Sequence, residues 1–198
     1  MAQGVLKFGE FTLNSGRVSP YFFNLGAVSD GLGFTELGRA YANAILAAEI
    51  EFDVLFGPAY KGIPIAVATA TALAEQGVHV GVAYNRKEAK DHGEGGQLVG
   101  AEVAGRVLLV DDVLTSGKAI RQSVDLIAQT DARIVGTVIA LDRAELFAGE
   151  VTAVEALASD LGVPIVSIAS VADIIEHVAD ASLRQRMLEY QQRYCRVA

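Results

Sequence analysis

The stretch from Arg106 to Arg121, RVLLVDDVLTSGKAIR, constrains the fold of this chain more than any other. Its apolar run from Val107 to Val110 predicts a buried strand that stops at two adjacent carboxylates, Asp111 and Asp112. After a short turn, the apolar residues change from a continuous run to helical spacing. A strand and a helix joined in this way are typical of an α/β fold, whose ligands bind at the carboxyl ends of the strands.

The turn itself contains Thr115, Ser116 and Gly117. A hydroxyl-rich turn that enters a helix presents free backbone N–H groups and a favourable dipole to an anion such as phosphate. Asp111 and Asp112 would repel phosphate, but carboxylates accept hydrogen bonds from vicinal hydroxyls. The two parts together predict a site for a phosphorylated sugar. The alternative is an ordinary turn in which Thr115 or Ser116 caps the helix and the aspartates are solvated.

Strands and helices alternate along the rest of the chain. Apolar runs predict strands over residues 53–56, 78–84, 107–110, 133–141 and 164–168. Helical spacing predicts helices over residues 35–49, 63–76, 152–161 and 181–194, and one that begins near Lys118. In the first helix, Leu37, Tyr41, Ile45 and Leu46 should share one face. This alternation indicates a parallel sheet covered by helices on both faces.

The N-terminal segment has a different pattern. Residues 5–13 alternate in polarity, residues 14–17 form a turn, and residues 20–25 are rich in aromatic side chains, among them Phe22 and Phe23. We expect a small hairpin that is separate from the main sheet. Core packing would explain the two phenylalanines without any role in binding.

Composition excludes several classes of protein. The 198 residues, 52% of them hydrophobic, suffice for one substantial core. A net charge of −8 argues against a general nucleic-acid surface, so nucleic acid is not an expected partner. The single cysteine, Cys195, excludes an intramolecular disulfide and suits a reducing compartment. Without a signal pattern or a membrane-spanning apolar stretch, we expect a cytoplasmic protein and no membrane partner.

Two loops that follow predicted strands combine glycines with cations. The first, GPAYKGIP, surrounds Lys61, and its alternative interpretation is a plain turn. The second, NRKEAKDHGEGG over residues 85–96, contains Arg86, Lys87, Lys90 and His92. Such a segment is usually a solvated run of charges. It also has the composition of a mobile lid that stabilises an anionic leaving group when it closes.

A third loop, residues 142–145, places Arg143 after the strand that ends at Leu141. An arginine in this position is usually part of a surface ion pair. Its planar guanidinium could instead bind a carboxylate through two parallel hydrogen bonds.

Two of these motifs resemble those of a known family. VDDVLTSG resembles the phosphoribosyl pyrophosphate (PRPP) binding motif of type I phosphoribosyltransferases, and NRKEAKDHGEGG resembles the catalytic loop of orotate phosphoribosyltransferases. The resemblance extends from Leu6 to the final helix. It implies one domain over residues 1–198, with a central parallel sheet flanked by helices. Residues 1–34 would form a small hood, residues 35–170 the α/β core, and residues 171–198 the C-terminal helices.

The resemblance also implies a reaction, the transfer of phosphoribosyl from PRPP to orotate. Mg²⁺ would be carried by PRPP and water rather than by protein ligands. The implied catalytic residues are Lys61, Arg86, Lys87, Lys90, His92, Asp111 and Asp112. The substrate-binding set contains these residues and also Phe22, Phe23, Tyr60, Val113, Leu114, Thr115, Ser116, Gly117, Lys118, Ala119 and Arg143.

Each group in that set has an implied role. The two aspartates would hold the ribose hydroxyls, and the turn from Thr115 to Ala119 would seat the 5-phosphate. The cations would stabilise the diphosphate as it leaves. Arg143 would bind the orotate carboxylate, with Phe22 and Phe23 near the orotate ring.

The resemblance further implies a homodimer in which Arg86, Lys90 and His92 reach the neighbouring site, while Lys87 serves its own.

One position departs from the family, because Asn14 stands where the family has a lysine. Only four residues precede Val5, where bacterial relatives usually have a further helix. Two other functions are the alternatives: a phosphoribosyltransferase for another base, and a non-catalytic regulator that senses PRPP. The charge of −8, with no added basic domain, gives the regulator little support.

Overall fold

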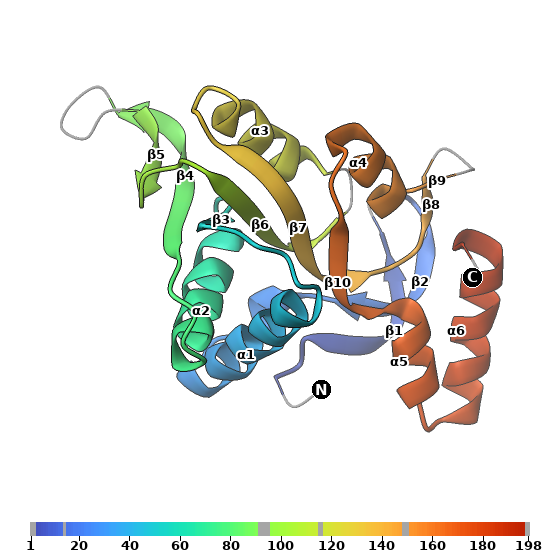
Figure 1. Cartoon of the computed structure of the whole chain (residues 1–198). Helices are drawn as coiled ribbons and strands as arrows, with labels where there is room; N and C mark the ends of the chain where they lie inside the picture. The colour runs from blue at the N-terminus through green and yellow to red at the C-terminus, as the bar shows by residue number, and fades with distance from the viewer. Residues whose placement is uncertain (1–2, 14, 91–95, 115–116, 148–150, 197–198) are drawn as a thin grey trace.

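The computed structural model describes residues 3–13, 15–90, 96–114, 117–147 and 151–196 (Figure 1). The first elements are β1 (Leu6–Thr12), β2 (Val18–Phe23), a short 3-10 helix (Leu25–Ala27), α1 (Gly31–Ala47), β3 (Val54–Gly57), α2 (Gly62–Glu75), β4 (Gly81–Lys90) and β5 (Gly96–Gly100). They are followed by β6 (Arg106–Val113), α3 (Lys118–Ile127), β7 (Arg133–Asp142), β8 (Leu146–Phe147), β9 (Val151–Thr152), α4 (Ala153–Leu161), β10 (Ile165–Ser170), α5 (Val171–His177) and α6 (Ala181–Tyr194).

A six-stranded sheet forms the centre of the molecule, in the order β10-β7-β6-β3-β4-β5. Neighbouring strands are parallel from β10 to β4, and only β5 at the edge is antiparallel. The predicted parallel sheet is therefore confirmed, with an antiparallel edge strand that was not predicted. The parallel strands direct their carboxyl ends, and the loops that follow them, to one edge of the sheet.

Helices cover both faces of this sheet (Figure 1). Along β6, Leu108 and Val110 pack into the cluster that contains residues of α1 and α2. The alternate residues Val107 and Leu109 pack into the cluster of α3 and α4. Side chains of a strand point alternately to opposite faces, so a continuous apolar run is buried from both sides.

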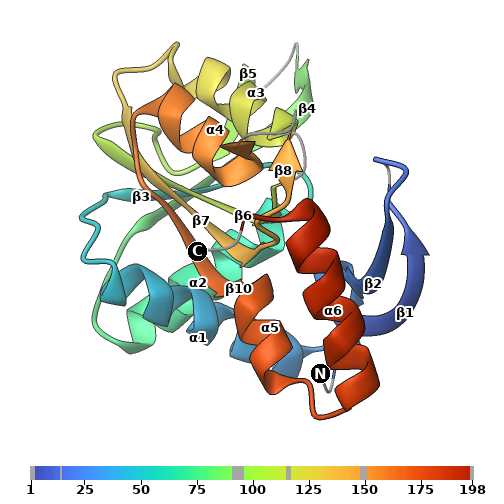
Figure 2. The same cartoon turned by 90° about the vertical axis from the view of Figure 1, so that its right-hand side faces the viewer.

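The N-terminal hairpin is confirmed as a separate two-stranded sheet of β1 and β2. It lies beside α6 (Figure 2). A third cluster joins the hairpin to the end of β7 and to the C-terminal helices, through Tyr21, Leu141, Met187 and Tyr190. The division into hood, core and C-terminal helices stays a prediction. Across the described residues, no helix is both long and apolar enough to span a bilayer.

The first helix differs from its prediction at both ends. It begins at Gly31 because the side chain of Asp30 accepts a hydrogen bond from the Gly33 amide at 2.7 Å and caps it. Tyr41 and Ile45 are buried as predicted, but Leu46 is 39% exposed.

The predicted loop at residues 85–96 is largely a hairpin. β4 continues to Lys90, and β5 pairs with it from Lys90–Gly96 to Ala83–Gly100, with an irregular register between Asn85 and Lys90. Charged side chains do not prevent a strand when backbone pairing with a neighbour is available. The loop prediction was wrong for residues 85–90, and His92 lies outside the described residues.

Candidate active site

Two adjoining cavities open at the carboxyl edge of the sheet. One, the acidic cavity, has a volume of about 370 Å³. The other, the aromatic cavity, has a volume of about 540 Å³. Val113 and Leu114, at the end of β6, line both of them. A ligand that fills both cavities would therefore cross the end of this strand.

The acidic cavity brings together the loop after β3, the end of β6 and the start of α3. Its lining consists of Ala59, Tyr60, Lys61, Asp111, Asp112, Val113, Leu114, Gly117, Lys118, Ala119, Ile120 and Gln122. Nine of the predicted substrate-binding residues are in this set. Sequence positions 59–61 and 111–122 meet here because β3 and β6 are parallel neighbours in the sheet.

The two aspartates do not stop the strand, as the sequence suggested, but are part of β6, which ends at Val113. Each is only 8% exposed. The main-chain carbonyl of Asp111 accepts a hydrogen bond from the buried Tyr41 hydroxyl at 2.7 Å, which fixes the strand end to α1. Burial, followed by the charge of Asp112, raises the pKa of Asp111 to about 6.

The loop after β3 folds tightly against the start of α2. A Cβ added at Gly57 would lie 2.1 Å from the carbonyl oxygen of Gly62, so the two glycines allow this close approach. The amide of Ala59 donates to Oδ1 of Asn85 at 3.0 Å, which ties the loop to β4. Lys61 then reaches over the cavity and donates to Oδ2 of Asp112 at 2.5 Å.

The start of α3, where the anion seat was predicted, lines the acidic cavity. Gly117 is its N-cap residue and has a φ of 65°, in the left-handed region that favours glycine. The first amides of a helix have no acceptor within the helix, and here they belong to Lys118, Ala119 and Ile120, which line the acidic cavity. Thr115 and Ser116 lie outside the described residues.

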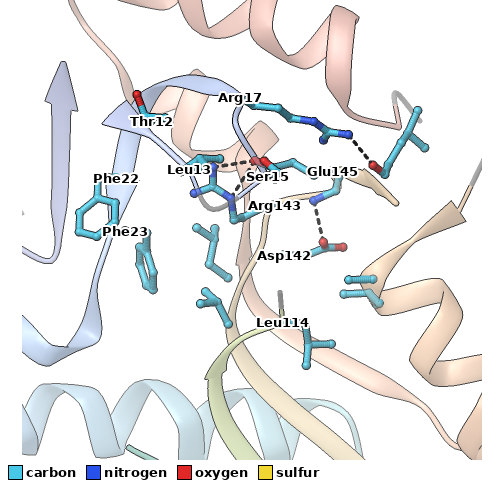
Figure 3. Close-up of a pocket in the computed structure, with 16 residues that line it drawn as sticks. Thr12, Leu13, Ser15, Arg17, Phe22, Phe23, Leu114, Asp142, Arg143 and Glu145 are labelled. Carbon is cyan, nitrogen blue, oxygen red and sulfur yellow. Dashed lines mark hydrogen bonds and ion pairs between the residues drawn. The ribbon is translucent and has the colours of Figure 1, made fainter. Parts of the chain in front are cut away.

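The aromatic cavity lies between the hairpin and the loop after β7 (Figure 3). Its lining consists of Thr12, Leu13, Ser15, Arg17, Phe22, Phe23, Val113, Leu114, Leu141, Asp142, Arg143, Ala144, Glu145, Leu146, Ala153 and Val154. Phe22 is 39% exposed and stacks on Phe11 with ring centroids 5.5 Å apart. Phe22 is therefore not core packing alone, because its ring also borders a cavity.

Arg143 is partly enclosed rather than a surface residue, since its side chain is 11% exposed. Its Nε and Nη2 donate to Oε1 of Glu145 at 2.9 and 2.6 Å, and Nη2 also donates to the Ser19 hydroxyl at 3.3 Å. The guanidinium lies over the ring of Tyr21, 4.3 Å from its centroid. Arg143 thus forms an ion pair and also lines the cavity, so the two interpretations of its sequence position are compatible.

The chain is similar to known phosphoribosyltransferases. The family described as phosphoribosyl transferase domain matches residues 27–147. Orotate phosphoribosyltransferase of Pseudomonas aeruginosa is 54% identical over 187 residues, which are 93% of this chain and 88% of that protein. The chain belongs to the orotate phosphoribosyltransferases.

Solved orotate phosphoribosyltransferases have the same fold. The enzyme of Francisella tularensis superposes with a TM-score of 0.89 at 36% identity, over 98% of this chain and 96% of that chain. The Mycobacterium tuberculosis enzyme in complex with PRPP superposes with a TM-score of 0.63 at 27% identity, over 82% and 88% of the two chains. The predicted type I phosphoribosyltransferase fold is confirmed.

The cations of the β4–β5 hairpin lie only partly within the described residues. Nζ of Lys87 lies 4.6 Å from the ring centroid of Tyr60, a residue that is 64% exposed at the rim of the acidic cavity. Arg86 is half-buried in β4. The backbone of Lys90 ends β4, but its side chain lies outside the described part. Of the hairpin cations, the structure places Lys87 beside the acidic cavity.

Sequence reasoning missed several residues around the aromatic cavity. Arg17 lines it and donates from Nη2 to the Leu146 carbonyl at 2.9 Å. Glu145 lies in the same loop as Arg143, but its sequence position alone did not predict a role for it. Tyr190, whose hydroxyl donates to Oε1 of Glu145 at 2.7 Å, gave no local signal because it belongs to the C-terminal helix.

Cys195 lies behind this site rather than in a catalytic position. The thiol is buried, and burial followed by the charge of Glu145 raises its pKa to about 12. A thiol with so high a pKa remains protonated at neutral pH and is a poor nucleophile.

Proposed function

We propose that this chain transfers the 5-phosphoribosyl group from PRPP to orotate, giving orotidine 5'-monophosphate and diphosphate for pyrimidine biosynthesis. The observation that carries this proposal is the meeting of the two cavities at Val113 and Leu114. The acidic cavity suits a phosphorylated sugar, and the aromatic cavity suits a planar base with a carboxylate. Their contact would bring the ribosyl carbon next to the attacking nitrogen of the base.

On the sugar side, Asp111 and Asp112 would accept hydrogen bonds from the ribose hydroxyls. The amides at the start of α3, with Thr115 and Ser116, would hold the 5-phosphate. As the bond between the ribosyl carbon and the diphosphate breaks, the sugar gains positive character and the leaving group gains negative charge. Lys61 lies at the mouth of the acidic cavity, where it can stabilise the diphosphate.

On the base side, Arg143 would bind the orotate carboxylate, and Phe22 and Phe23 would border the ring. The side chain of Arg143 lies in a largely apolar enclosure, where a charge-assisted hydrogen bond is stronger than in water. A base without a carboxylate would offer this guanidinium no anion in addition to Glu145. This supports orotate over uracil or a purine.

Mg²⁺ would enter with PRPP. In the described ranges, no group of three or more His, Cys, Asp or Glu side chains is placed to hold a metal ion, and Asp112 is already paired with Lys61. Asp111 and Asp112, the acidic doublet, could contact a hydrated ion carried by the diphosphate. The role of that ion would be to neutralise the leaving group. These residues fit a cofactor bound mainly through the substrate and water.

We further propose the shared-site homodimer, with Arg86, Lys90 and His92 acting at the neighbouring site. The contact between Lys87 and Tyr60 supports a role for Lys87 at its own site. The reducing, cytoplasmic location expected from the single cysteine stays a prediction.

The loss of orotate absorbance after addition of PRPP and Mg²⁺ tests the proposed reaction. We expect the signal to require all three components and to be absent with Asp112→Asn at the same concentrations. Uracil and adenine, followed by separation of their products, test the choice of base. Turnover of either base with no turnover of orotate would overturn the proposal.

A further inference from the structure

We propose that Glu145 and Tyr190 are positioning residues for Arg143, so that the C-terminal helix sets how the chain holds the substrate carboxylate. Hydrogen bonds join the three side chains in series, from α6 to the wall of the aromatic cavity. The inference rests on the proposed function, because it concerns the residue proposed to bind orotate.

The ion pair with Glu145 determines which edge of the guanidinium is available. Nε and Nη2 of Arg143 both donate to Oε1 of Glu145, and the second hydrogen of Nη2 faces the Ser19 hydroxyl. Within the described ranges, no protein acceptor bonds to Nη1. Figure 3 shows Glu145 on one side of the guanidinium, with Phe22 and Phe23 on the other side. Nη1 is therefore the donor left for a ligand in the cavity.

Tyr190 holds Glu145 in the orientation that this arrangement needs. Its hydroxyl donates to the same Oε1 atom at 2.7 Å, and its ring is 5% exposed. The ring also packs edge-on against Tyr21, with centroids 6.3 Å apart. The ring of Tyr21 in turn packs against the guanidinium of Arg143. A carboxylate held by two donors from different elements has little freedom to rotate.

The chain after α6 anchors the same loop through its backbone. The Arg196 amide donates to the Ala144 carbonyl at 2.8 Å, and Cys195 forms an antiparallel bridge with Glu145. Ala144 has a φ of 50°, in the left-handed region that is unfavourable for alanine. Contacts from the C-terminal segment thus stabilise a turn that its own residues disfavour. These contacts fix the position of Arg143 before substrate binds, which lowers the conformational-entropy cost of binding.

The decisive variant is Tyr190→Phe, because it removes one hydroxyl and leaves every charge and ring in place. We expect the KM for orotate to rise by about 5- to 10-fold, less than the full effect of losing one hydrogen bond to a charged group, because Tyr190 acts on the substrate only through Glu145 and Arg143. The KM for PRPP and the thermal midpoint should change little. Glu145→Asp keeps the charge but withdraws the carboxylate, and it should produce the same selective rise. Glu189→Asp makes the same change on the exposed face of α6 and serves as its control.

A double-mutant cycle separates this inference from the proposed function. In an Arg143→Lys background, Tyr190→Phe should have no further effect on the KM for orotate, because the guanidinium it positions is gone. If Arg143→Lys leaves the KM for orotate unchanged, the proposed role of Arg143 fails. If Arg143→Lys raises it but Tyr190→Phe has no effect, or the same effect in both backgrounds, the positioning inference fails and the proposed function stands.

Discussion

Lys61 and Asp112 form an ion pair, with Nζ 2.5 Å from Oδ2, that joins the loop after β3 to the end of β6. The pair neutralises one carboxylate of the doublet and leaves Asp111 buried beside it. Asp111 has no cation in direct contact in the described part of the chain, and its pKa is raised to about 6 by burial and by Asp112. The two aspartates, adjacent in sequence, therefore differ in their contacts, because Asp112 is paired with Lys61 and Asp111 is not.

The raised pKa of Asp111 predicts how the stability of the protein depends on pH. The pKa of Asp111 is about 6 in the native state and 3.8 in its ordinary environment, so the native state binds more protons between these values. Its contribution to stability is present below about pH 4 and is lost as the pH rises through 6. Asp111→Asn should remove this slope and, without substrates, stabilise the protein by about 3 kcal/mol at pH 8.

Denaturant unfolding at pH 4.5, 6 and 8 measures the free energy of unfolding of the Asp111→Asn variant and of the original chain, and hence the difference between them at each pH. Equal differences at all three pH values would show that Asp111 does not titrate in this range.

Arg143→Ala tests the choice of base. We expect kcat/KM for orotate to fall by an amount that corresponds to about 2–5 kcal/mol of lost transition-state stabilisation, since a partly buried carboxylate would lose its cation. The KM for PRPP should change little, because PRPP occupies the other cavity in our proposal. Stability should also fall, because Glu145 loses its partner. Steady-state kinetics with each substrate varied in turn give both constants, and equal losses for orotate and PRPP would assign Arg143 a general structural role.

Mixed dimers test whether sites are shared. Lys90→Ala and Asp112→Asn should each be inactive alone. After subunit exchange, half of the dimers are mixed, and each mixed dimer contains one site with an intact acidic doublet and an intact hairpin. Activity should then recover to roughly a quarter of the original by symmetry. If mass spectrometry shows that the subunits have exchanged and activity still does not recover, each hairpin acts on the site of its own chain.

The end of α1 offers a test of stability that is independent of the site. Glu49, two residues after the helix, has a φ of 52° and is exposed. A non-glycine residue in this conformation costs about 1 kcal/mol, and a negative charge at a helix C-terminus is also unfavourable. Glu49→Gly should therefore raise the thermal midpoint by about 2–4 °C. Glu49→Gln removes only the charge, and an equal rise for both variants would exclude the backbone explanation.

The sequence by itself determined the framework of the acidic cavity. The apolar run before Asp111, the glycine at 117 and the helical spacing after Lys118 specify a strand, a turn and a helix through interactions between near neighbours. Parallel strands direct their following loops to one edge, so Lys61 and the doublet could be placed together without coordinates. Local periodicity and turn chemistry contain this information because they depend on residues only a few positions apart.

Only the tertiary structure decided what surrounds Arg143. Its partners include Ser19, 124 positions away on β2, and Glu145 is held by Tyr190, 45 positions away on α6. It also decided that β4 continues to Lys90, because backbone pairing with β5 outweighs the charge-rich composition there. A sequence period states which face of an element a side chain occupies. Which residue it meets on that face depends on how distant elements pack, and no local pattern specifies that.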